Sequence, residues 1–440
     1  MKIAPLSGFP EYLPQERIVE RSVLDTLRST FELHGFSEVE TRAVEPLDQL
    51  LRKGETSKEI YLLSRLQGGQ DQDAQLGLHF DLTVPLARYV LEHAGKLDFP
   101  FKRYQIQKVW RGERPQDGRF REFYQADVDV VGQDTLAFHH EVELPLVMVD
   151  ALSKLPIPKV TVRASNRKLA QGFYEAIGIE DTEGTLRVMD KLDKVGASAV
   201  AEMLTEEVGA NAQQADLAVQ LASIRTSDTS FADRVRALGY HSELLDAGLE
   251  ELTRLVDEAN ALIPGSLQAD LSIARGLDYY TGSVYESTLE GHEDLGSVCS
   301  GGRYDNLVAQ GNKKFPGVGL SIGVSRLVSR FIGRGLLQAT RKVPTAVYVA
   351  VTDEAERLHA EKIAMSLRAR GIAADVSPNS QKFGKQIRNA DRRGIPFVWF
   401  TAEDGEQVRD IRSGEQVPAD PDVWEPPAAD LRPAVVSSDE

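Results

Sequence analysis

The sequence predicts an α+β fold, in which an antiparallel sheet is flanked by helices and followed by a smaller α/β domain. Residues 101–111 and 120–131 are rich in aromatic and β-branched side chains and are separated by turn-forming residues, which is typical of an antiparallel hairpin. Residues from about 185 to 262 are rich in Ala, Leu and Glu and predict a helical insertion. After residue 345, strand and helix patterns alternate, which indicates a small α/β domain.

The composition excludes several classes of protein. The chain has 440 residues, 42% hydrophobic and 27% charged, which is ordinary for a globular protein of roughly two to four domains. Its 51 basic and 67 acidic residues give a net charge of −16, so indiscriminate binding to polyanions is not expected. No apolar run approaches the ~20 residues of a membrane span, and the N-terminus lacks a signal-peptide core. The single cysteine, Cys299, permits neither an internal disulfide nor a cysteine-based zinc site, which is typical of a cytoplasmic protein.

The elements around the insertion follow from local patterns. Hydrophobic residues recur at helical spacing over 15–34, and Gly35 provides a C-terminal stop. A short extended stretch covers 36–39, and 80–94 predict the end of a strand that enters a helix. Strands return after the insertion at 267–273, 281–288 and 296–299, and a further strand enters a helix over 317–333.

The predicted domain map has four parts. A first domain covers 1–333 and includes the insertion. A linker with a changed composition covers 334–344, and the α/β domain covers 345–417. Residues 418–440 are acidic and rich in Pro and Ser, so we expect a flexible tail.

Each strand of the predicted hairpin has one apolar face and one face of hydrogen-bonding side chains, because the pattern alternates with a period of two. This fits either a half-exposed sheet with a solvated outer face or a rigid bed for a polar ligand. The mixture of Arg, Gln and Asp favours the ligand bed, since it suits a zwitterion with phosphate. The polar face includes Arg103, Gln105, Gln107, Gln125, Asp127 and Asp129.

The hairpin loop carries four arginines, Arg111, Arg114, Arg119 and Arg121. Guanidinium groups fork onto phosphate oxygens in a way that lysine cannot, so this enrichment favours an anion site over a solvated loop tip. The sequence has no P-loop, and GVGLSIG at 317–323 departs from the dinucleotide fingerprint. Any bound ATP would therefore be held by arginines and a sheet.

Two later segments, 274–286 and 297–307, each combine an arginine, tyrosines and glycines. Glycine lets the backbone approach a ligand closely, and tyrosine offers a flat face with a directed hydroxyl. One such segment would fit a twisted strand with aromatic packing. Two segments of the same composition favour a pocket.

These segments resemble those of a known family. RGERPQDGRFREFYQADVD (111–129) is similar to the second motif of class II aminoacyl-tRNA synthetases, and GVGLSIGVSRL (317–327) to the third. RGLDYYTG (275–282) and SGGRYDNL (300–307) resemble the two signature motifs of histidyl-tRNA synthetases. The resemblance spans nearly the whole chain and implies a class II catalytic domain, a C-terminal anticodon-binding domain and histidine–tRNA ligase activity. It also implies ATP with Mg²⁺, L-histidine and tRNA(His) as ligands, with no zinc.

For the ATP site, the resemblance implies one role for each of five residues. Arg111 would contact the α-phosphate, and Glu113 and Arg119 would lie in the ATP-binding loop. Phe123 would stack on adenine, and Arg326 would clamp the nucleotide.

For the histidine site, the resemblance implies a catalytic pair, Arg111 and Arg275, of which Arg275 would bridge the substrate carboxylate and the α-phosphate. Neutral imidazole has one donor and one acceptor, so Asp129 can accept from it and the Tyr280 hydroxyl can donate to it. The α-amino group would be held by Asp81, Thr83 and Gln125. The implied histidine-binding residues also include Tyr279 and Tyr304.

The implied tRNA contacts lie in two places. Lys385, Arg388 and Arg392 follow i, i+3, i+7 and share one face of a predicted helix. Charge alone fits a solvated helix equally well, and the resemblance favours anticodon binding. Arg114 and Gln116 in the hairpin loop are candidates for contacting the acceptor end.

The family's first motif builds a dimer interface and usually carries a proline where this chain has Arg42. We still expect a homodimer. One alternative function is that of the family's inert paralogue, a regulatory subunit of ATP phosphoribosyltransferase, which typically lacks the C-terminal domain and has degraded signature motifs. A second is a tRNA-sensing module without chemistry, which the arginines at 111, 275 and 326 disfavour.

Overall fold

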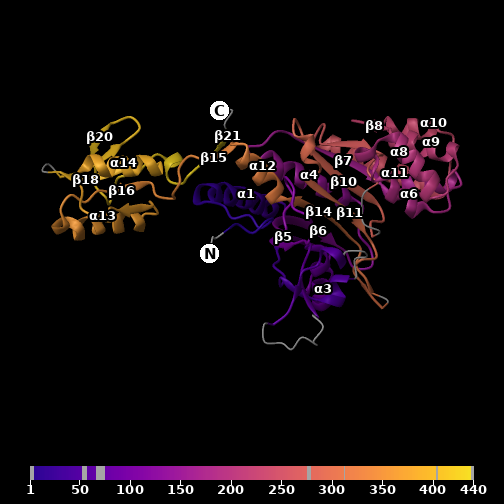
Figure 1. The fold of residues 1–440 in the computed structure, drawn as a ribbon, viewed down its shortest axis with the longest axis horizontal. Coiled ribbons are helices and arrows are strands. Elements are labelled where there is room, and N and C mark those ends of the chain that lie inside the picture. The colour runs from indigo at the N-terminus through magenta and orange to yellow at the C-terminus, as the bar shows by residue number, and fades with distance from the viewer. Residues whose placement is uncertain are drawn as a thin grey trace. The chain divides into compact units, whose positions relative to one another are not determined.

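The computed structural model describes residues 4–51, 57–65, 75–274, 279–311, 313–402 and 405–437, and they form two compact units (Figure 1). The first unit comprises Met1–Pro10 and Val23–Arg330, and the second comprises Glu11–Ser22 and Phe331–Glu440. None of the described helices combines the length and the apolar composition that a membrane span requires.

A nine-stranded sheet forms the centre of the first unit, in the order β1-β5-β6-β14-β11-β10-β7-β9-β8. Its neighbouring strands run antiparallel except for β1–β5 and β7–β9. The predicted hairpin is confirmed, because β5 (Phe101–Trp110) pairs with β6 (Glu122–Val131) along its whole length. The other strands are β1 (Ser37–Glu38), β7 (Val160–Asn166), β8 (Arg225–Thr226), β9 (Leu267–Asp270), β10 (Ser283–Leu289), β11 (Cys299–Tyr304) and β14 (Gly317–Gly323).

Shorter elements border this sheet. A three-stranded sheet has the order β2-β4-β3, and β12 pairs with β13. The helix that sequence analysis expects within 80–94 is α3 (Thr83–His93). The remaining bounds are β2 (Val44–Pro46), α2 (Leu47–Leu50), β3 (Leu62–Leu63), β4 (Leu76–Leu78), β12 (Ala309–Gln310) and β13 (Lys313–Lys314).

The apolar face of the sheet packs against helices, as the period-two alternation predicts. On β5, Tyr104 stacks near Phe31 of α1 (Pro14–Leu33), with ring centroids 5.7 Å apart, and its hydroxyl donates to Glu32 at 2.8 Å. Helix α4 (His139–Ser153) packs on β6, β7 and β14. The antiparallel sheet flanked by helices confirms the predicted α+β fold.

The insertion is helical, and its helices gather beside β8 in Figure 1. The side chains of Asp181, Asn211 and Ser242 cap α6, α9 and α11 by accepting backbone N–H bonds. Helix α11 crosses α5 (Arg167–Ala176) where both carry glycine, since a Cβ on Gly172 or Gly248 would lie within 2.3 Å of the opposite backbone. The helices are α6 (Thr182–Met189), α7 (Leu192–Val195), α8 (Ala197–Glu207), α9 (Ala212–Ala222), α10 (Phe231–Ala237) and α11 (Glu243–Leu262).

The second unit contains a five-stranded mixed sheet in the order β17-β16-β18-β19-β20. The alternation of strands and helices expected from the sequence is present, and β17, β16 and β18 run parallel. The hairpin of β19 (Gly405–Asp410) and β20 (Gln416–Pro418) adds two antiparallel strands that sequence analysis missed. The other elements are β16 (Val347–Val349), α13 (Arg357–Ala369), β17 (Ala374–Val376), α14 (Phe383–Arg393) and β18 (Phe397–Ala402). Helix α12 (Val324–Gly333) follows β14 and ends in this unit.

The structure differs from the predicted domain map at 334–344 and at 418–440. The predicted linker contains β15 (Leu337–Ala339), which pairs with β21 (Val435–Ser437) near the C-terminus. The expectation of a flexible tail is therefore wrong for its described part, 418–437. The physical reason is that a β-ladder satisfies the backbone groups of both segments.

An aromatic anchor also holds the C-terminal segment. Trp424 packs edge-on against Phe397 and Trp399, with ring centroids 5.3 and 5.7 Å apart. Arg370 donates to the carbonyls of Pro421 and Trp424 at 3.2 and 2.7 Å. The acidic, proline-rich composition of this segment did not indicate these contacts, which come from individual side chains.

Candidate active site

The register of the nine-stranded sheet aligns polar side chains in a row across one face. Directly paired residues of neighbouring strands place their side chains on the same face. The alternate residue Tyr285 points to the other face, where its hydroxyl donates to the Glu141 carbonyl of α4 at 2.7 Å. The polar row consists of Gln105, Asp127, Ser321, Ser300, Glu286 and Arg163 on β5, β6, β14, β11, β10 and β7.

A buried ion pair lies next to this row. Arg103 on β5 faces Asp129 on β6, with Nη2 and Oδ2 2.7 Å apart and both side chains almost excluded from solvent. The Tyr304 hydroxyl donates to Asp129 Oδ1 at 2.8 Å. Opposite Asp129 stands Gly319, where a Cβ would lie 2.0 Å from Oδ1. A glycine is therefore required for the carboxylate to occupy this place.

The polar face of the hairpin is buried rather than solvated. Five of its side chains are each at most 9% exposed, so the half-exposed-sheet alternative is wrong for them. Burying polar groups costs free energy unless partners are supplied, which favours a ligand bed. The five are Arg103, Gln105, Gln125, Asp127 and Asp129.

The start of α3 brings Asp81 and Thr83 beside this pair. Asp81 is buried, and its Oδ1 accepts from the Val84 N–H at 3.1 Å, which holds the carboxylate at the start of the helix. Thr83 is the first residue of α3. The Arg103 guanidinium donates to the Leu82 carbonyl at 3.4 Å, which joins the start of α3 to the sheet.

Carboxylates outnumber cations in this region. The pKa of Asp127 is raised from 3.8 to about 7. Burial is the largest cause of the rise, and the charges of Asp129 and Asp81 add to it, whereas Arg103 and a hydrogen bond from Ser321 act against it. Three carboxyl groups thus surround one buried guanidinium, and the negative charge of the region increases when Asp127 loses its proton. Such an arrangement suits a cationic ligand group.

A cavity of about 260 Å³ opens over β6, β11 and β14, next to this acidic region. It is lined by all five residues for which an ATP role was predicted, and by the predicted histidine-binding Gln125. Three arginines and one glutamate make the lining positive, which suits a polyphosphate. The five are Arg111, Glu113, Arg119, Phe123 and Arg326.

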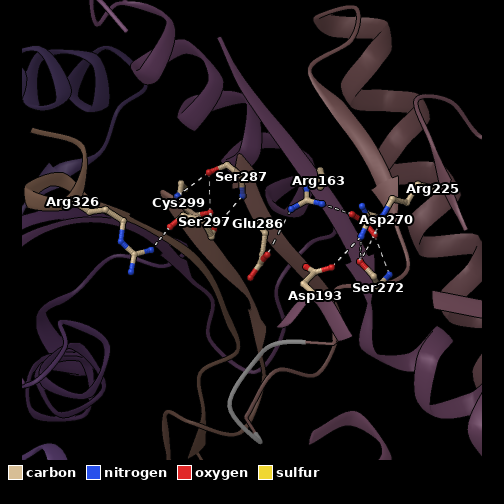
Figure 2. A network of polar contacts seen from close by, with 10 residues as sticks. All are labelled: Arg163, Asp193, Arg225, Asp270, Ser272, Glu286, Ser287, Ser297, Cys299 and Arg326. Atoms are coloured by element: carbon tan, nitrogen blue, oxygen red, sulfur yellow. Dashed lines mark hydrogen bonds and ion pairs between the residues drawn. The ribbon is translucent and has the colours of Figure 1, made fainter. Parts of the chain in front are cut away.

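Backbone carbonyls fix the two deeper arginines. Arg111 donates from Nε to the Phe80 carbonyl at 2.9 Å, and its guanidinium lies 5.2 Å from the centre of the Phe123 ring. Arg326 donates from Nε to the Gly118 carbonyl at 3.1 Å and from Nη1 to the Ser297 carbonyl at 2.7 Å, the latter drawn in Figure 2.

The strand that leads to the first signature segment is anchored by a polar network (Figure 2). The buried Asp270 of β9 accepts from Arg163 at 2.5 Å and from Arg225 at 3.0 Å. Arg225 also donates to the Ser272 hydroxyl at 2.8 Å. Arg275, which follows three residues later, lies outside the described residues, so its predicted role stays a prediction.

The two segments rich in glycine and tyrosine lie side by side. The Thr281 N–H donates to the Arg303 carbonyl at 2.9 Å. The Tyr279 and Tyr280 hydroxyls are 3.1 Å apart, and the Tyr279 ring lies 6.3 Å from that of Tyr304. The structure therefore brings the three predicted tyrosines together beside Asp129.

The predicted tRNA residues lie in two separate places. On the hairpin loop, Arg114 and Gln116 are exposed, and Gln116 exchanges backbone hydrogen bonds with Arg119 around a tight turn. In the second unit, three exposed side chains of α14 line one cavity of about 540 Å³, as their spacing predicts. These are Lys385, Arg388 and Arg392.

Comparison with known proteins identifies the family. The histidyl-tRNA synthetase family model matches residues 8–327, and an anticodon binding domain model matches 346–422. The chain belongs to the histidyl-tRNA synthetase family. A histidine–tRNA ligase of Micrococcus luteus is 59% identical, with 98% of each chain covered.

Solved structures carry the same architecture. The crystal structure of histidyl-tRNA synthetase from Nostoc sp. PCC 7120 is 36% identical, covers 95% of this chain and 96% of its own, and has a TM-score of 0.85. An ATP phosphoribosyltransferase regulatory subunit/histidyl-tRNA synthetase from Bacillus halodurans is 20% identical, covers 88% of this chain and 97% of its own, and has a TM-score of 0.73. At that identity the likeness shows the fold alone, so the fold does not separate synthetase from regulator.

In this histidyl-tRNA synthetase homologue, the alternation along β5 and β6 predicted that Arg103 and Asp127 lie on the polar face, but no motif implied a role for either residue. The alternation of each strand gave their direction. Arg103 pairs with Asp129, and Asp127 lies opposite Ser321, because of the register between neighbouring strands. The pattern within a single strand does not predict this register.

Proposed function

We propose that this protein is a histidine–tRNA ligase. In the first step, the carboxylate of L-histidine attacks the α-phosphorus of ATP, and the bond to pyrophosphate breaks. In the second, a ribose hydroxyl at the 3′ end of tRNA(His) attacks the adenylate carbonyl, and AMP leaves. The observation that carries the proposal is the juxtaposition, on one sheet face, of an arginine-lined cavity and a buried acidic region.

This reaction requires the protein to position the substrates and to neutralise charge, and it requires no general base. A carboxylate is already a nucleophile, so catalysis consists of aligning two anions and neutralising the charge that develops between them. We assign this role to Arg111 and, from its motif, to Arg275. ATP enters as its Mg²⁺ complex, so the metal is part of the substrate. Glu113, Arg119, Phe123 and Arg326 would hold the nucleotide.

Specificity for histidine would come from hydrogen bonds in the acidic region. Asp129 is held by Arg103 and Tyr304, so its position is fixed before a ligand arrives. An imidazole N–H that bonds to Asp129 and a ring nitrogen that accepts from Tyr280 would satisfy a neutral imidazole completely. An apolar analogue could form neither of these two hydrogen bonds, which would lower the selectivity for it by ~10⁴-fold.

We assign tRNA recognition to α14 and to the hairpin loop. The lining of the α14 cavity carries three exposed cations, which suits the phosphates of an anticodon loop. Arg114 and Gln116 stand exposed beside the ATP cavity, where the acceptor end must arrive. We place the reaction in the cytoplasm because its tRNA partner is found there.

We also propose a homodimer. Strand β1 lies at the edge of the nine-stranded sheet, and its two residues are exposed. Arg42, which replaces the usual proline, pairs with Glu45 at 3.1 Å, and Arg88 holds the same carboxylate. The replacement is thus accommodated within the chain. Light scattering should give twice the chain mass of 48.6 kDa, and a monomer would contradict the dimer.

The decisive experiment is ATP–pyrophosphate exchange with each standard amino acid in turn, followed by charging of tRNA(His). We expect exchange with histidine alone. No exchange with any amino acid from a folded sample would favour the regulatory paralogue, and tRNA binding without charging would favour the sensing module.

A further inference from the structure

Two buried acceptor atoms on β6 have no hydrogen-bond partner among the described residues. They are Oε1 of Gln125 and Oδ1 of Asp127, which lie two residues apart on the same face of the strand. Both side chains are at most 9% exposed. Buried acceptors are normally paired, so unpaired ones in a ligand bed indicate donors that arrive with the ligand.

The polar side chains next to these two acceptors already form hydrogen bonds and an ion pair with one another. Gln125 donates from Nε2 to the Ser321 hydroxyl at 2.7 Å, and Ser321 in turn hydrogen-bonds to Asp127. Arg103 and Tyr304 hold the two oxygens of Asp129. The ion pair of Arg103 is therefore directed to Asp129 rather than to Asp127.

The carboxylate, the ammonium and the imidazole-bearing side chain of histidine branch from one Cα, and three polar side chains along β6 form a row that these groups can face. Gln125 lines the arginine cavity, Asp127 comes next on the same face, and Asp129 follows beside the tyrosines. Alternate residues of a strand are ~7 Å apart. A histidine whose carboxylate faces Arg111 and whose imidazole reaches Asp129 would place its ammonium between them, over Asp127.

We propose that Asp127 is a further substrate-binding residue, which binds the α-ammonium of the amino-acid substrate, with Gln125 Oε1 as a second acceptor. The proposal rests on the proposed function, and it adds a carboxylate to the amino-group contacts that the family motifs imply. An ammonium brings three donors and a positive charge. It would satisfy both unpaired acceptors and offset the excess of acidic groups, which come from the start of α3 (Asp81) and from β6.

The test compares the full-length protein with its Asp127→Asn variant in ATP–pyrophosphate exchange. We expect the KM for L-histidine to rise roughly 10- to 100-fold, with kcat changing by less than about 3-fold. The inhibitor 3-(imidazol-4-yl)propanoate lacks the amino group, so its Ki should change by less than about 3-fold. Asp257→Asn, an exposed change on α11, is the matched control and should alter neither constant.

Two outcomes would overturn the proposal. An unchanged KM would make Asp127 a structural residue, and equal rises in the KM for histidine and the Ki of the deamino compound would place its effect on the imidazole or the fold. If Asp127→Asn does not fold, Asp127→Ser takes its place with the same outcomes. Failure of the wild-type protein to exchange with histidine would instead contradict the proposed function itself.

Discussion

Burial of the Asp127 carboxyl raises its pKa to about 7, whereas a carboxyl in an unfolded chain titrates near ~3.9. The folded protein therefore holds a proton that the unfolded chain has lost between these values. Its contribution to stability is fully present below the unfolded pKa and is lost as the pH rises through the folded pKa. The free protein should thus lose stability between about pH 4 and pH 7.

The Asp127→Asn variant should be free of this loss. We expect its free energy of unfolding, relative to wild type, to improve by roughly 2 kcal/mol on going from pH 5.5 to pH 8, since one pKa unit corresponds to ~1.4 kcal/mol. Urea denaturation at both pH values measures the difference. Asp257→Asn should track wild type, and parallel pH profiles of wild type and Asp127→Asn would contradict the buried-carboxyl explanation.

A substitution at Gly319 tests whether the Arg103–Asp129 ion pair needs the space that is left by the missing side chain of this glycine. Gly319→Ala would place a Cβ 2.0 Å from Asp129 Oδ1, so either the carboxylate or the strand must shift. We expect a loss of about 1–3 kcal/mol in the free energy of unfolding and a higher KM for histidine. Gly95→Ala, where a Cβ meets nothing within 4 Å, is the control. Wild-type values for Gly319→Ala would show that the site tolerates a methyl group.

At the scale of elements, the hairpin and α14 each present a face that local spacing predicts. The hairpin face becomes a site because its neighbours bury it, whereas the α14 face stays exposed and lines an open cavity. Helix α14 is held by the buried Gln386, whose amide hydrogen-bonds to the N–H and the carbonyl of Val351. The three cations can therefore change without altering the buried side of the helix.

The triple variant Lys385→Gln/Arg388→Gln/Arg392→Gln should separate the two reaction steps. We expect the KM for tRNA in aminoacylation to rise roughly 10- to 100-fold, with a weaker salt dependence, because phosphate contacts are lost. Histidine-dependent exchange needs no tRNA and should be unchanged. Lys362→Gln on α13 of the same unit serves as the control. An unchanged KM for tRNA would rule out this helix as a contact.

At the scale of the whole molecule, the chain forms two units with separate cores, and the candidate active site lies in the first. The second has its own apolar cluster, against which Trp424 and Leu431 from the C-terminal segment pack. A change confined to that cluster should leave histidine activation intact.

Trp424→Ala should destabilise the second unit by roughly 1–3 kcal/mol, because the half-buried indole loses its contacts with Phe397 and Trp399. We expect the thermal transition of that unit to fall while histidine-dependent exchange stays at the wild-type rate. Val423→Ala, at a side chain that is 71% exposed, is the adjacent control. If the thermal transition temperature of Trp424→Ala equals that of the wild type, the C-terminal segment is flexible and is not held by Trp424.

The sequence by itself determined the features that depend on neighbours along the chain. The hairpin, the helical insertion and the alternating strands and helices of the second unit follow from periodicity and turn residues. The motifs identified the family and the residues that line the arginine-rich cavity of the first unit. The docking of 418–437 was missed because composition averages over a segment, whereas a few apolar side chains, among them Trp424 and Leu431, pack against the core of the second unit.

Only the tertiary structure decided which polar residues meet. The pairing of Arg103 with Asp129, and the bond from Ser321 to Asp127, depend on the register between strands brought together by the fold. Burial of that face is likewise a property of the packed molecule. The pKa of Asp127 follows from both, because desolvation and distant charges act through space rather than along the chain.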